Sequence, residues 1–314
     1  MEKRNGFGNG NANVFSQGLM TTKTNNQGRS YLDALYKEIF IENVYWEFID
    51  CPEFRRLREI KQLGVSHYIF PSAMHTRYEH CIGTWSVAKN LLDNLQKMSM
   101  GDIEFEENDL RNIMVAALCH DIGHGPFSHT FDNHFIQPLF PDLNWSHEQQ
   151  GVELIEYIID NNHIDDFTKN DVRMIQDLII GKSTPDPSYS GFDHQISKSY
   201  DEEGWMFDIV NNKRNSIDVD KLDYIDRDTI RLGLHNYTYD NTKLLNGARI
   251  IDDQICYSKD SALSIHDLFI TRYKLFRDIY THKCTQGIEL MICDILKQSN
   301  DYFKFHEIVQ DMEE

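Results

Sequence analysis

The chain has 314 residues, of which 31 are Lys or Arg and 50 are Asp or Glu, giving a formal net charge of −19. This acidity excludes a generally basic nucleic-acid-binding protein. Hydrophobic residues at 40% and aromatic residues at 12% exclude a disordered chain. No apolar run approaches the roughly 20 residues of a membrane helix, and the N-terminus lacks a signal-peptide pattern. The six cysteines are scattered, so we expect reduced thiols in an intracellular protein of the nucleus or cytoplasm, without membrane contact.

Taken in chain order, the predicted elements are mostly helices. Residues 1–28 are rich in Asn and Gly and are predicted to be a disordered tail. The run CPEFRRLREIKQL has apolar residues at every third position, and Pro52 suits its first turn. Thr76 and Glu79 fit a capping box that begins the next helix. The sequence therefore predicts two helices in this first part of the chain.

Glycine, proline and capping residues predict the boundaries of the middle helices. DLRNIMVAALCHD is an apolar helix that should end near Gly123. Ser128 is expected to cap a short helix, and a second capping box from Ser146 to Gln149 begins another. Residues 181–200 contain Pro, Ser and Gly throughout and are predicted to be a loop.

The last third of the chain completes the prediction. A helix is expected over about 218–232, a hairpin within 250–257, and one long or broken helix over about 264–303. The predicted fold is all-α with at most a small β-hairpin. Residues 29–314 are expected to form a single domain.

Histidine is concentrated in one stretch of the chain. Five of the 14 histidines lie within 28 residues, at positions 120, 124, 129, 134 and 147. Clustered imidazoles indicate metal binding, proton transfer or anion contact. The alternative is a set of partly buried polar histidines on helices.

A mixed set of imidazoles and carboxylates is the strongest candidate for a metal site. His80 lies in the first turn of its helix, His120 and Asp121 lie at a helix end, and Asp220 begins another helix. Neighbouring helix residues point about 100° apart, so an adjacent His-Asp pair serves one site most easily where a helix ends. Nitrogen and oxygen ligands without thiolates suit Mn, Fe, Zn or Mg and disfavour a structural zinc site. The run LCHDIGHGPFSHTFD places His124, His129 and Asp132 near such a metal, and His147 and Glu148 can approach from the next helix.

The spacing of His80, His120-Asp121 and Asp220 resembles that of the HD-domain metal-dependent phosphohydrolases. The segments FRRLREIKQLGVSHYIFPSAMHTRYEHCIG, ALCHDIGHGPFSHTF, WSHEQ and IDVDKLDYIDRDTIRLG are similar to the eukaryotic SAM-and-HD-domain deoxynucleoside triphosphate triphosphohydrolases and their bacterial relatives. The similarity covers about residues 49–300, and we expect no SAM domain in this chain. The resemblance implies an HD-domain fold and hydrolysis of deoxynucleoside triphosphates (dNTPs) to deoxynucleoside and inorganic triphosphate.

The resemblance also implies a role for each matching residue. His80, His120, Asp121 and Asp220 would ligate a divalent metal (Mn, Mg, Fe or Zn). His124, His129, Asp132 and His147 would lie along the triphosphate and the scissile bond, supported by Glu148. Arg77, Lys221 and Arg272 would bind phosphates, Tyr224 and Asp228 would contact phosphate and sugar, and Gln62, Leu63 and Tyr280 would close around the deoxyribose. A tyrosine ring against C2′ leaves no room for a ribose hydroxyl.

These roles fit the chemistry of attack on the α-phosphorus. A metal lowers the pKa of bound water from about 16 toward 7, and local cations offset the negative charge that develops. His129, oriented by Asp132, suits protonation of the departing 5′-oxygen. Each role has a structural alternative: Arg77 can pair with Glu79 or Asp121, and Tyr224 and Tyr280 can be core aromatics. Lys221, Asp223 and Arg227 can be ordinary i,i+4 helix partners.

Two departures from the related sequences bear on regulation and assembly. An Asp-Pro-Ile-His-Gly signature of the relatives appears here as residues 33–37, DALYK. Asp50 and Arg58 fit the regulatory nucleotide pocket of the vertebrate-type enzymes, whereas Leu32 and Glu38 do not. We therefore expect activation by GTP or dNTP to be lost or its effector preference changed. The chain ends before the C-terminal lobe of the relatives, so either it is a truncated form or assembly differs; a homo-oligomer, dimer or tetramer, is the expectation carried over.

Other functions remain open at this point. Within HD enzymes they are a nucleoside monophosphate phosphatase, a cyclic nucleotide phosphodiesterase or a guanosine-tetraphosphate hydrolase. Outside enzymes, a non-catalytic nucleotide- or nucleic-acid-binding module is the alternative. Single-stranded nucleic acid binding by the basic residues 55–61 would show a steep salt dependence.

Overall fold

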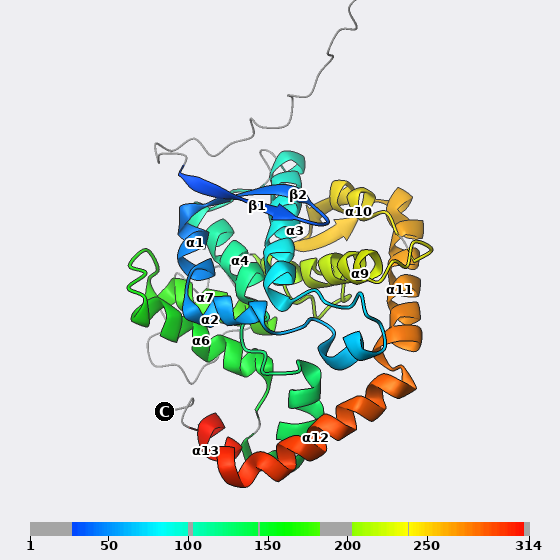
Figure 1. Cartoon of the computed structure of the whole chain (residues 1–314). Coiled ribbons are helices and arrows are strands. Elements are labelled where there is room, and N and C mark those ends of the chain that lie inside the picture. Colours follow the sequence, from blue (N-terminus) through cyan, green and yellow to red (C-terminus); the bar gives the residue numbers. More distant parts are fainter. Residues whose placement is uncertain (1–26, 100–102, 144, 183–202, 238, 311–314) are drawn as a thin grey trace, which may run out of the picture.

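A computed structural model describes residues 27–99, 103–143, 145–182, 203–237 and 239–310 (Figure 1). Most of the predicted tail (1–26) and most of the predicted loop (183–200) lie outside the described residues. Gly28 was included in the tail but begins a strand, because it pairs with Glu42. None of the described helices is long and apolar enough to cross a membrane.

The first described elements form an antiparallel hairpin that the sequence did not predict. Strands β1 (Gly28–Asp33) and β2 (Lys37–Glu42) pair from Gly28 with Glu42 to Asp33 with Lys37. Asp33 Oδ1 accepts hydrogen bonds from the backbone N–H groups of Leu35 at 2.7 Å and Tyr36 at 3.0 Å, which holds the turn. Ile39 and Ile41 of β2 are buried, so one face of the hairpin packs on the core.

Short and long helical elements follow the hairpin, and the helix after Thr76 begins where the capping box places it. They are α1 (Asn43–Ile49), α2 (Pro52–Arg55), the 3₁₀ turns η1 (Arg56–Arg58) and η2 (Gly64–Tyr68), α3 (Arg77–Met98) and α4 (Glu107–Cys119). The predicted helix after Pro52 is only one α-helical turn followed by a 3₁₀ turn. The Thr76 N–H donates to Glu79 Oε1 at 3.1 Å, as the capping box requires.

The middle of the chain winds irregularly before two regular helices. Its elements are the π-helix η3 (Thr130–Ile136), α5 (Gln137–Leu139), η4 (Pro141–Leu143), α6 (His147–Asn161) and α7 (Lys169–Ile180). Ser146 Oγ accepts from the Gln149 N–H at 3.2 Å and caps α6. Ser128 does not cap η3 with its side chain: its hydroxyl donates to the Lys61 carbonyl at 2.8 Å and accepts from Arg77.

The last part of the chain contains the predicted hairpin and the broken helix. Its elements are η5 (Gly204–Asp208), α9 (Val219–Arg231), α10 (Asn241–Gly247), β3 (Ala248–Ile251), β4 (Gln254–Tyr257), η6 (Lys259–Ser261), α11 (Ala262–Leu275), the π-helix η7 (Phe276–Tyr280), α12 (Lys283–Phe303) and α13 (Phe305–Gln310). Residues 281 and 282 separate η7 from α12.

Helix α3 is the centre of the packing. It contacts α4, α9 and β3, and its residues Trp85, Ile82 and Leu95 are fully buried. Figure 1 shows α3 between α4 and α9, with α12 along the bottom of the view, where it contacts η3. Burial of these apolar faces is the main stabilising contribution. The predicted all-α fold class is confirmed, with one hairpin more than expected.

Candidate metal centre and active-site pocket

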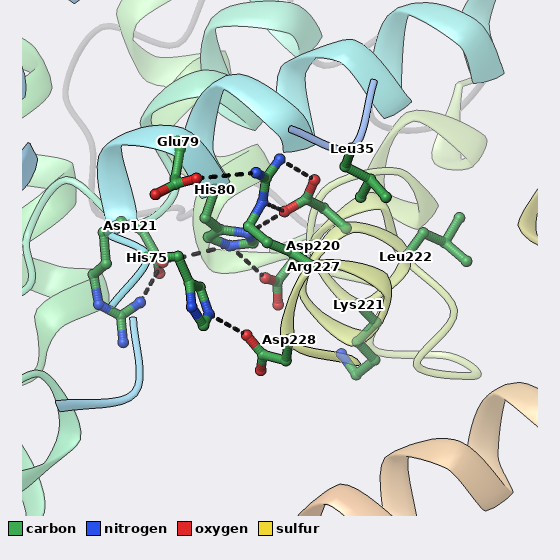
Figure 2. A network of polar contacts seen from close by, with 12 residues as sticks. Leu35, His75, Glu79, His80, Asp121, Asp220, Lys221, Leu222, Arg227 and Asp228 are labelled. Atoms are coloured by element: carbon green, nitrogen blue, oxygen red, sulfur yellow. Dashed lines mark hydrogen bonds and ion pairs between the residues drawn. The ribbon is translucent and has the colours of Figure 1, made fainter. Parts of the chain in front are cut away.

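Three helices bring the four predicted metal ligands together. His80 lies on α3, His120 and Asp121 follow the end of α4, and Asp220 lies in the first turn of α9. Figure 2 shows His80, Asp121 and Asp220 from these three segments. His80 Nε2 is 3.1 Å from His120 Nε2 and 3.1 Å from Asp220 Oδ1. His120 Nε2 is 3.4 Å from Asp220 Oδ1, and an Asp121 oxygen lies 3.5 Å from His80 Nε2. The ligand atoms of these residues therefore converge on one point.

The donor atoms fit a divalent metal in both spacing and protonation. Ligands bound at about 2.0–2.2 Å lie roughly 3.0–3.5 Å from one another, close to the separations observed here. His80 Nδ1 lies 2.7 Å from Asp223 Oδ2, and His120 Nδ1 lies 2.9 Å from the Ala117 carbonyl. Because these oxygens accept, each Nδ1 carries the proton and each Nε2 presents its lone pair. The four residues can therefore hold a divalent ion.

A buried ion-pair network lies behind His80. Arg227 Nε donates to Asp223 Oδ2 at 2.8 Å, and Arg227 Nη1 donates to Asp33 Oδ2 at 2.9 Å. All three side chains are fully buried. Burial opposes ionisation of Asp223, but the Arg227 guanidinium and the His80 imidazole prevail and lower its pKa to about 2. The network therefore holds a charged carboxylate against the candidate ligand.

Gly83 allows this network to lie against α3. A Cβ atom at Gly83 would be 2.1 Å from both Arg227 Nη2 and Asp223 Oδ1. The sequence predicts that Asp223 and Arg227 pair four residues apart on one helix, and the structure confirms this pairing. It missed Asp33, whose spacing from Arg227 gives no local signal.

A second group of histidines lies beside the metal centre. Ligand atoms of His124, His129, Asp132 and His147 lie within 4.8 Å of one another. His147 Nδ1 is 2.7 Å from Asp132 Oδ2, and the rings of His124 and His147 stack with centroids 3.7 Å apart. The two His124 nitrogens are 3.3 Å from Asp121 and 3.6 Å from Asp132, without hydrogen-bond geometry to any described residue.

Two imidazoles of this second group, those of His124 and His129, are held neutral. Burial and the charge of Arg77 lower the pKa of His124 well below its usual range. The pKa of His129 is also lowered, to about 4, although its side chain is 61% exposed. The causes are desolvation by the surrounding residues, then the neighbouring Arg77 and His147. Neutral imidazoles next to one another avoid the mutual repulsion that two imidazolium ions would suffer.

Close packing of α6 brings His147 to this position. A Cβ atom at Gly123 would lie only 2.0 Å from the His147 carbonyl oxygen and 2.3 Å from the Gly151 nitrogen. Glycine at 123 therefore lets the start of α6 pack against the turn that follows α4. This is the physical reason for one glycine of the HDIGHG run.

A cavity of about 670 Å³ joins both groups. His80 and Asp132 lie beneath its surface, and the remaining predicted site residues line it: Gln62, Leu63, Arg77, His120, Asp121, His124, His129, His147, Glu148, Asp220, Lys221, Tyr224, Asp228, Arg272 and Tyr280. The structure therefore brings the predicted residues to one place. It adds Lys213 to the lining, which sequence analysis did not single out.

Each predicted phosphate-binding cation already contacts a neighbouring side chain. Arg77 pairs with Asp121, which is one of the predicted alternatives, and Lys221 Nζ donates to Asp218 Oδ2 at 2.9 Å. Arg272 Nε donates to Tyr224 Oη at 3.0 Å. These contacts fix the cations at the cavity wall in the absence of an anion.

Another part of the site combines aromatic and acidic groups. Tyr280 Oη donates to Asp228 Oδ2 at 2.5 Å, and a His75 nitrogen lies 2.5 Å from Asp228 Oδ1. Gln62 Oε1 is buried and has no hydrogen-bond partner among the described residues. His75 was missed, although it stands directly before the Thr76 cap and adds another imidazole to that segment.

Comparison with known proteins shows which family this site resembles. Residues 77–228 match the HD domain family. The chain is 34% identical to the deoxynucleoside triphosphate triphosphohydrolase SAMHD1 homolog of Dictyostelium discoideum, over 90% of the chain and 51% of that protein. It is 35% identical to deoxynucleoside triphosphate triphosphohydrolase SAMHD1 of Homo sapiens, over 87% of the chain and 45% of that protein. The chain carries an HD domain and is related to SAMHD1. A putative HD domain-containing protein of Acanthamoeba polyphaga mimivirus is 30% identical over 89% of the chain.

These similarities cover only part of the relatives, and the HD domain match covers only part of this chain. The chain spans about half the length of the SAMHD1 relatives it matches. The HD domain match contains all four candidate metal ligands and ends at Asp228. Gln62, Leu63, Arg272 and Tyr280 lie outside it, so part of the cavity lining comes from the segments that flank the match.

Proposed function

We propose that this protein hydrolyses dNTPs to deoxynucleosides and inorganic triphosphate in a metal-dependent reaction. The observation that carries the proposal is one cavity lined by three of the four candidate metal ligands, three histidines of the second group and the three predicted phosphate-binding cations, with His80 and Asp132 beneath its surface. The names of the relatives support the choice of substrate class. The cavity volume of about 670 Å³ is within the range of small-molecule sites.

The residues at the metal centre supply the activation of water. A divalent ion (Mn, Mg, Fe or Zn) held by His80, His120, Asp121 and Asp220 would lower the pKa of bound water toward 7. Arg77, Lys221 and Arg272 offset the negative charge of the triphosphate, which matters more in a chain of net charge −19. Water adds to the α-phosphorus, and the bond from phosphorus to the 5′-oxygen breaks.

His129 is the proposed proton donor to the leaving 5′-oxygen. Its side chain is exposed at the cavity, unlike that of His124, which is buried. Its pKa is lowered to about 4 in the free protein. A bound triphosphate adds negative charge beside the ring and raises that pKa, so His129 gains its proton together with the substrate. Asp132 and Glu148 hold His147 next to it.

The deoxyribose is proposed to lie against Tyr280, Leu63 and Gln62. Asp228 offers carboxylate oxygens to a sugar hydroxyl, and Tyr224 accepts a hydrogen bond from the phosphate-binding Arg272. A ring packed against C2′ excludes a ribose hydroxyl. We therefore propose dNTPs rather than NTPs as substrates.

Regulation and assembly belong to the same proposal. Asp33 of the altered signature is buried with Arg227, whereas Arg58 stacks on Tyr78 and Asp50 pairs with Arg29 at the surface. We propose that activation by GTP or dNTP is lost or changed in effector, and that the protein acts as a homo-oligomer.

Product analysis tests the proposed reaction. The protein is incubated with each dNTP and NTP, with Mn, Mg, Fe or Zn, with and without GTP, and products are separated by ion-exchange chromatography. We expect triphosphate and deoxynucleoside from dNTPs, and a loss of about 10³-fold or more in the Asp220→Asn variant. The Asp220 side chain is 30% exposed, so this change leaves the fold intact, and exposed Asp267 on α11 provides the control Asp267→Asn.

Other outcomes separate the alternatives. Orthophosphate or pyrophosphate as product contradicts attack on the α-phosphorus and indicates another HD phosphohydrolase activity. Tight nucleotide binding without turnover under all metals indicates a non-catalytic binding module. Binding of single-stranded nucleic acid that weakens steeply with salt would indicate a role for the basic residues 55–61.

A further inference from the structure

His75 is a buried histidine that the proposed mechanism leaves unused. It stands directly before α3, its side chain is fully buried, and one ring nitrogen, Nε2, lies 2.5 Å from Asp228 Oδ1. Figure 2 shows this contact bridging the segment before α3 and the last turns of α9. Because an ionised carboxylate only accepts, Nε2 carries the proton and donates.

His75 contacts two groups of the cavity wall without reaching the cavity itself. Its carbonyl accepts from the Gln62 N–H at 3.0 Å, and its ring holds Asp228. Gln62 and Asp228 line the cavity, whereas His75 lies behind it in the described structure. Any effect of His75 on a substrate must therefore pass through these two residues.

Asp228 is fixed from two sides. His75 donates to one carboxylate oxygen and Tyr280 donates to the other, each at 2.5 Å. A carboxylate has about four acceptor positions, so two remain for a ligand in the cavity. A 2′-deoxynucleoside 5′-triphosphate has a single free sugar hydroxyl, at C3′, because C1′ carries the base, C2′ carries no hydroxyl and the 5′-oxygen carries the triphosphate. That hydroxyl is the natural donor to Asp228.

A purely structural histidine explains this site poorly. His75 Nδ1 is buried without a hydrogen-bond partner among the described residues. An unpaired buried nitrogen costs free energy that an apolar side chain of similar size avoids. The polar ring is therefore retained at a cost, and the contact that it makes is the one with Asp228.

We propose that His75 is a positioning residue for recognition of the deoxyribose, acting through Asp228 and Gln62. This inference rests on the proposed dNTP hydrolysis. With His75 in place, the Asp228 carboxylate keeps one orientation, facing the 3′-hydroxyl. Without the donor, the carboxylate turns and the preference for a substrate with a 3′-hydroxyl falls.

Substrate discrimination tests this role. The preference is the ratio of kcat/KM for a dNTP to kcat/KM for the matching 2′,3′-dideoxynucleoside triphosphate, which lacks the 3′-hydroxyl. We expect a ratio of about 10–100 in the wild type, typical of a hydrogen bond to a charged group. His75→Gln places an amide donor near the Nε2 position and should retain most of this ratio. His75→Asn places its donor near the Nδ1 position and should reduce the ratio to below about 3.

Matched variants separate positioning from folding. His67→Phe changes a histidine of the neighbouring η2 turn that does not contact Asp228, and it should keep the wild-type ratio. His75→Phe fills the site without a donor and replaces His75→Asn if that variant melts at a much lower temperature. Asp228→Asn should lose the ratio, and combining it with His75→Asn should add no further loss.

The outcomes distinguish the two proposals. If His75→Asn and His75→Phe keep the wild-type ratio while Asp228→Asn loses it, the positioning role is wrong and dNTP hydrolysis stands. An additive loss in the double variant also contradicts action through Asp228. If the wild type hydrolyses no dNTP, the proposed function fails and the positioning role fails with it.

Discussion

The two histidine–aspartate groups of the cavity are built from the same types of side chain, but their side chains are held in different ways. In the metal centre, His80 and His120 each donate from Nδ1 to a fixed oxygen behind them. In the second group, His124 has no hydrogen-bond partner among the described residues, and His129 is 61% exposed. The first group is fixed before any ligand arrives, whereas the second has nitrogens free to meet one.

One matched pair of contacts locates the difference. Asp223 Oδ2 lies 2.7 Å from His80 Nδ1, and Asp132 Oδ2 lies 2.7 Å from His147 Nδ1. Asp223 is held in turn by Arg227, whereas Asp132 Oδ1 has no hydrogen-bond partner among the described residues. A charged tether orients a metal ligand, and an untethered carboxylate can adjust as a proton moves. The same distance therefore serves two tasks.

Among the variants that compare these two supporting carboxylates, the larger effect is expected from Asp132→Asn. It removes the negative charge that orients His147 and His129, so we expect kcat for dNTP hydrolysis to fall about 10²–10³-fold. Metal affinity should stay within about 2-fold of the wild type, because Asp132 lies in the other group. Steady-state kinetics at saturating metal and isothermal titration with Mn measure the two quantities. A loss of metal affinity in this variant would show that the second group also holds an ion.

A smaller effect is expected from Asp223→Asn, and it concerns metal affinity rather than kcat. It weakens the hold on the His80 ring, so metal affinity should fall about 10–100-fold. Activity should recover when metal is added in excess, which it does not in Asp132→Asn. Titration of activity against metal concentration measures this recovery. The melting temperature is measured as well, since Arg227 loses a charged partner in this variant. Unchanged metal affinity would show that Asp223 only stabilises the fold.

A third carboxylate, one helical turn from Asp223, sharpens the comparison because no imidazole holds it. This carboxylate belongs to Asp226. Burial raises its pKa to about 7, and the charge of Asp223 adds to the rise, although Asn241 donates a hydrogen bond to Asp226 at 3.1 Å. The native state then binds more protons than the unfolded state between about pH 4 and pH 7, so this group lowers stability as pH rises through that window. Asp226→Asn should therefore stabilise the protein by about 1–2 kcal/mol at pH 8 and by little at pH 4.

Urea unfolding at the two pH values measures this difference. Asp267→Asn, an exposed aspartate on α11, serves as the control and should change stability by less than about 0.5 kcal/mol at either pH. Equal stability of wild type and Asp226→Asn at pH 8 would mean that the Asp226 carboxylate is well solvated.

The sequence was most informative where chemistry and local structure coincide. His80, His120, Asp121 and Asp220 were predicted because adjacent His and Asp serve one site at a helix end, and because their spacing resembles HD-domain enzymes. The helix starts after Thr76 and Ser146 follow from side-chain caps within three residues. These signals are local, so they can be recognised in a single sequence.

The supporting contacts were missed because they join distant segments. Asp33 meets Arg227 only after the β1–β2 hairpin packs against α9, and His75 meets Asp228 across 153 positions. Ser128 was expected to cap a helix, but tertiary packing places its hydroxyl between Lys61 and Arg77. Local propensity cannot anticipate a partner that the fold supplies.

The span from Asp33 to Arg227 also sets an order of events during synthesis. The two residues are separated by 194 positions, and a ribosome that adds about 5–20 residues per second takes about 10–40 s to cover them. Throughout that interval the β1–β2 hairpin has emerged without the cation that its aspartate requires. We therefore expect the metal centre to close late, so a nascent chain would capture its ion only after α9 has left the ribosome.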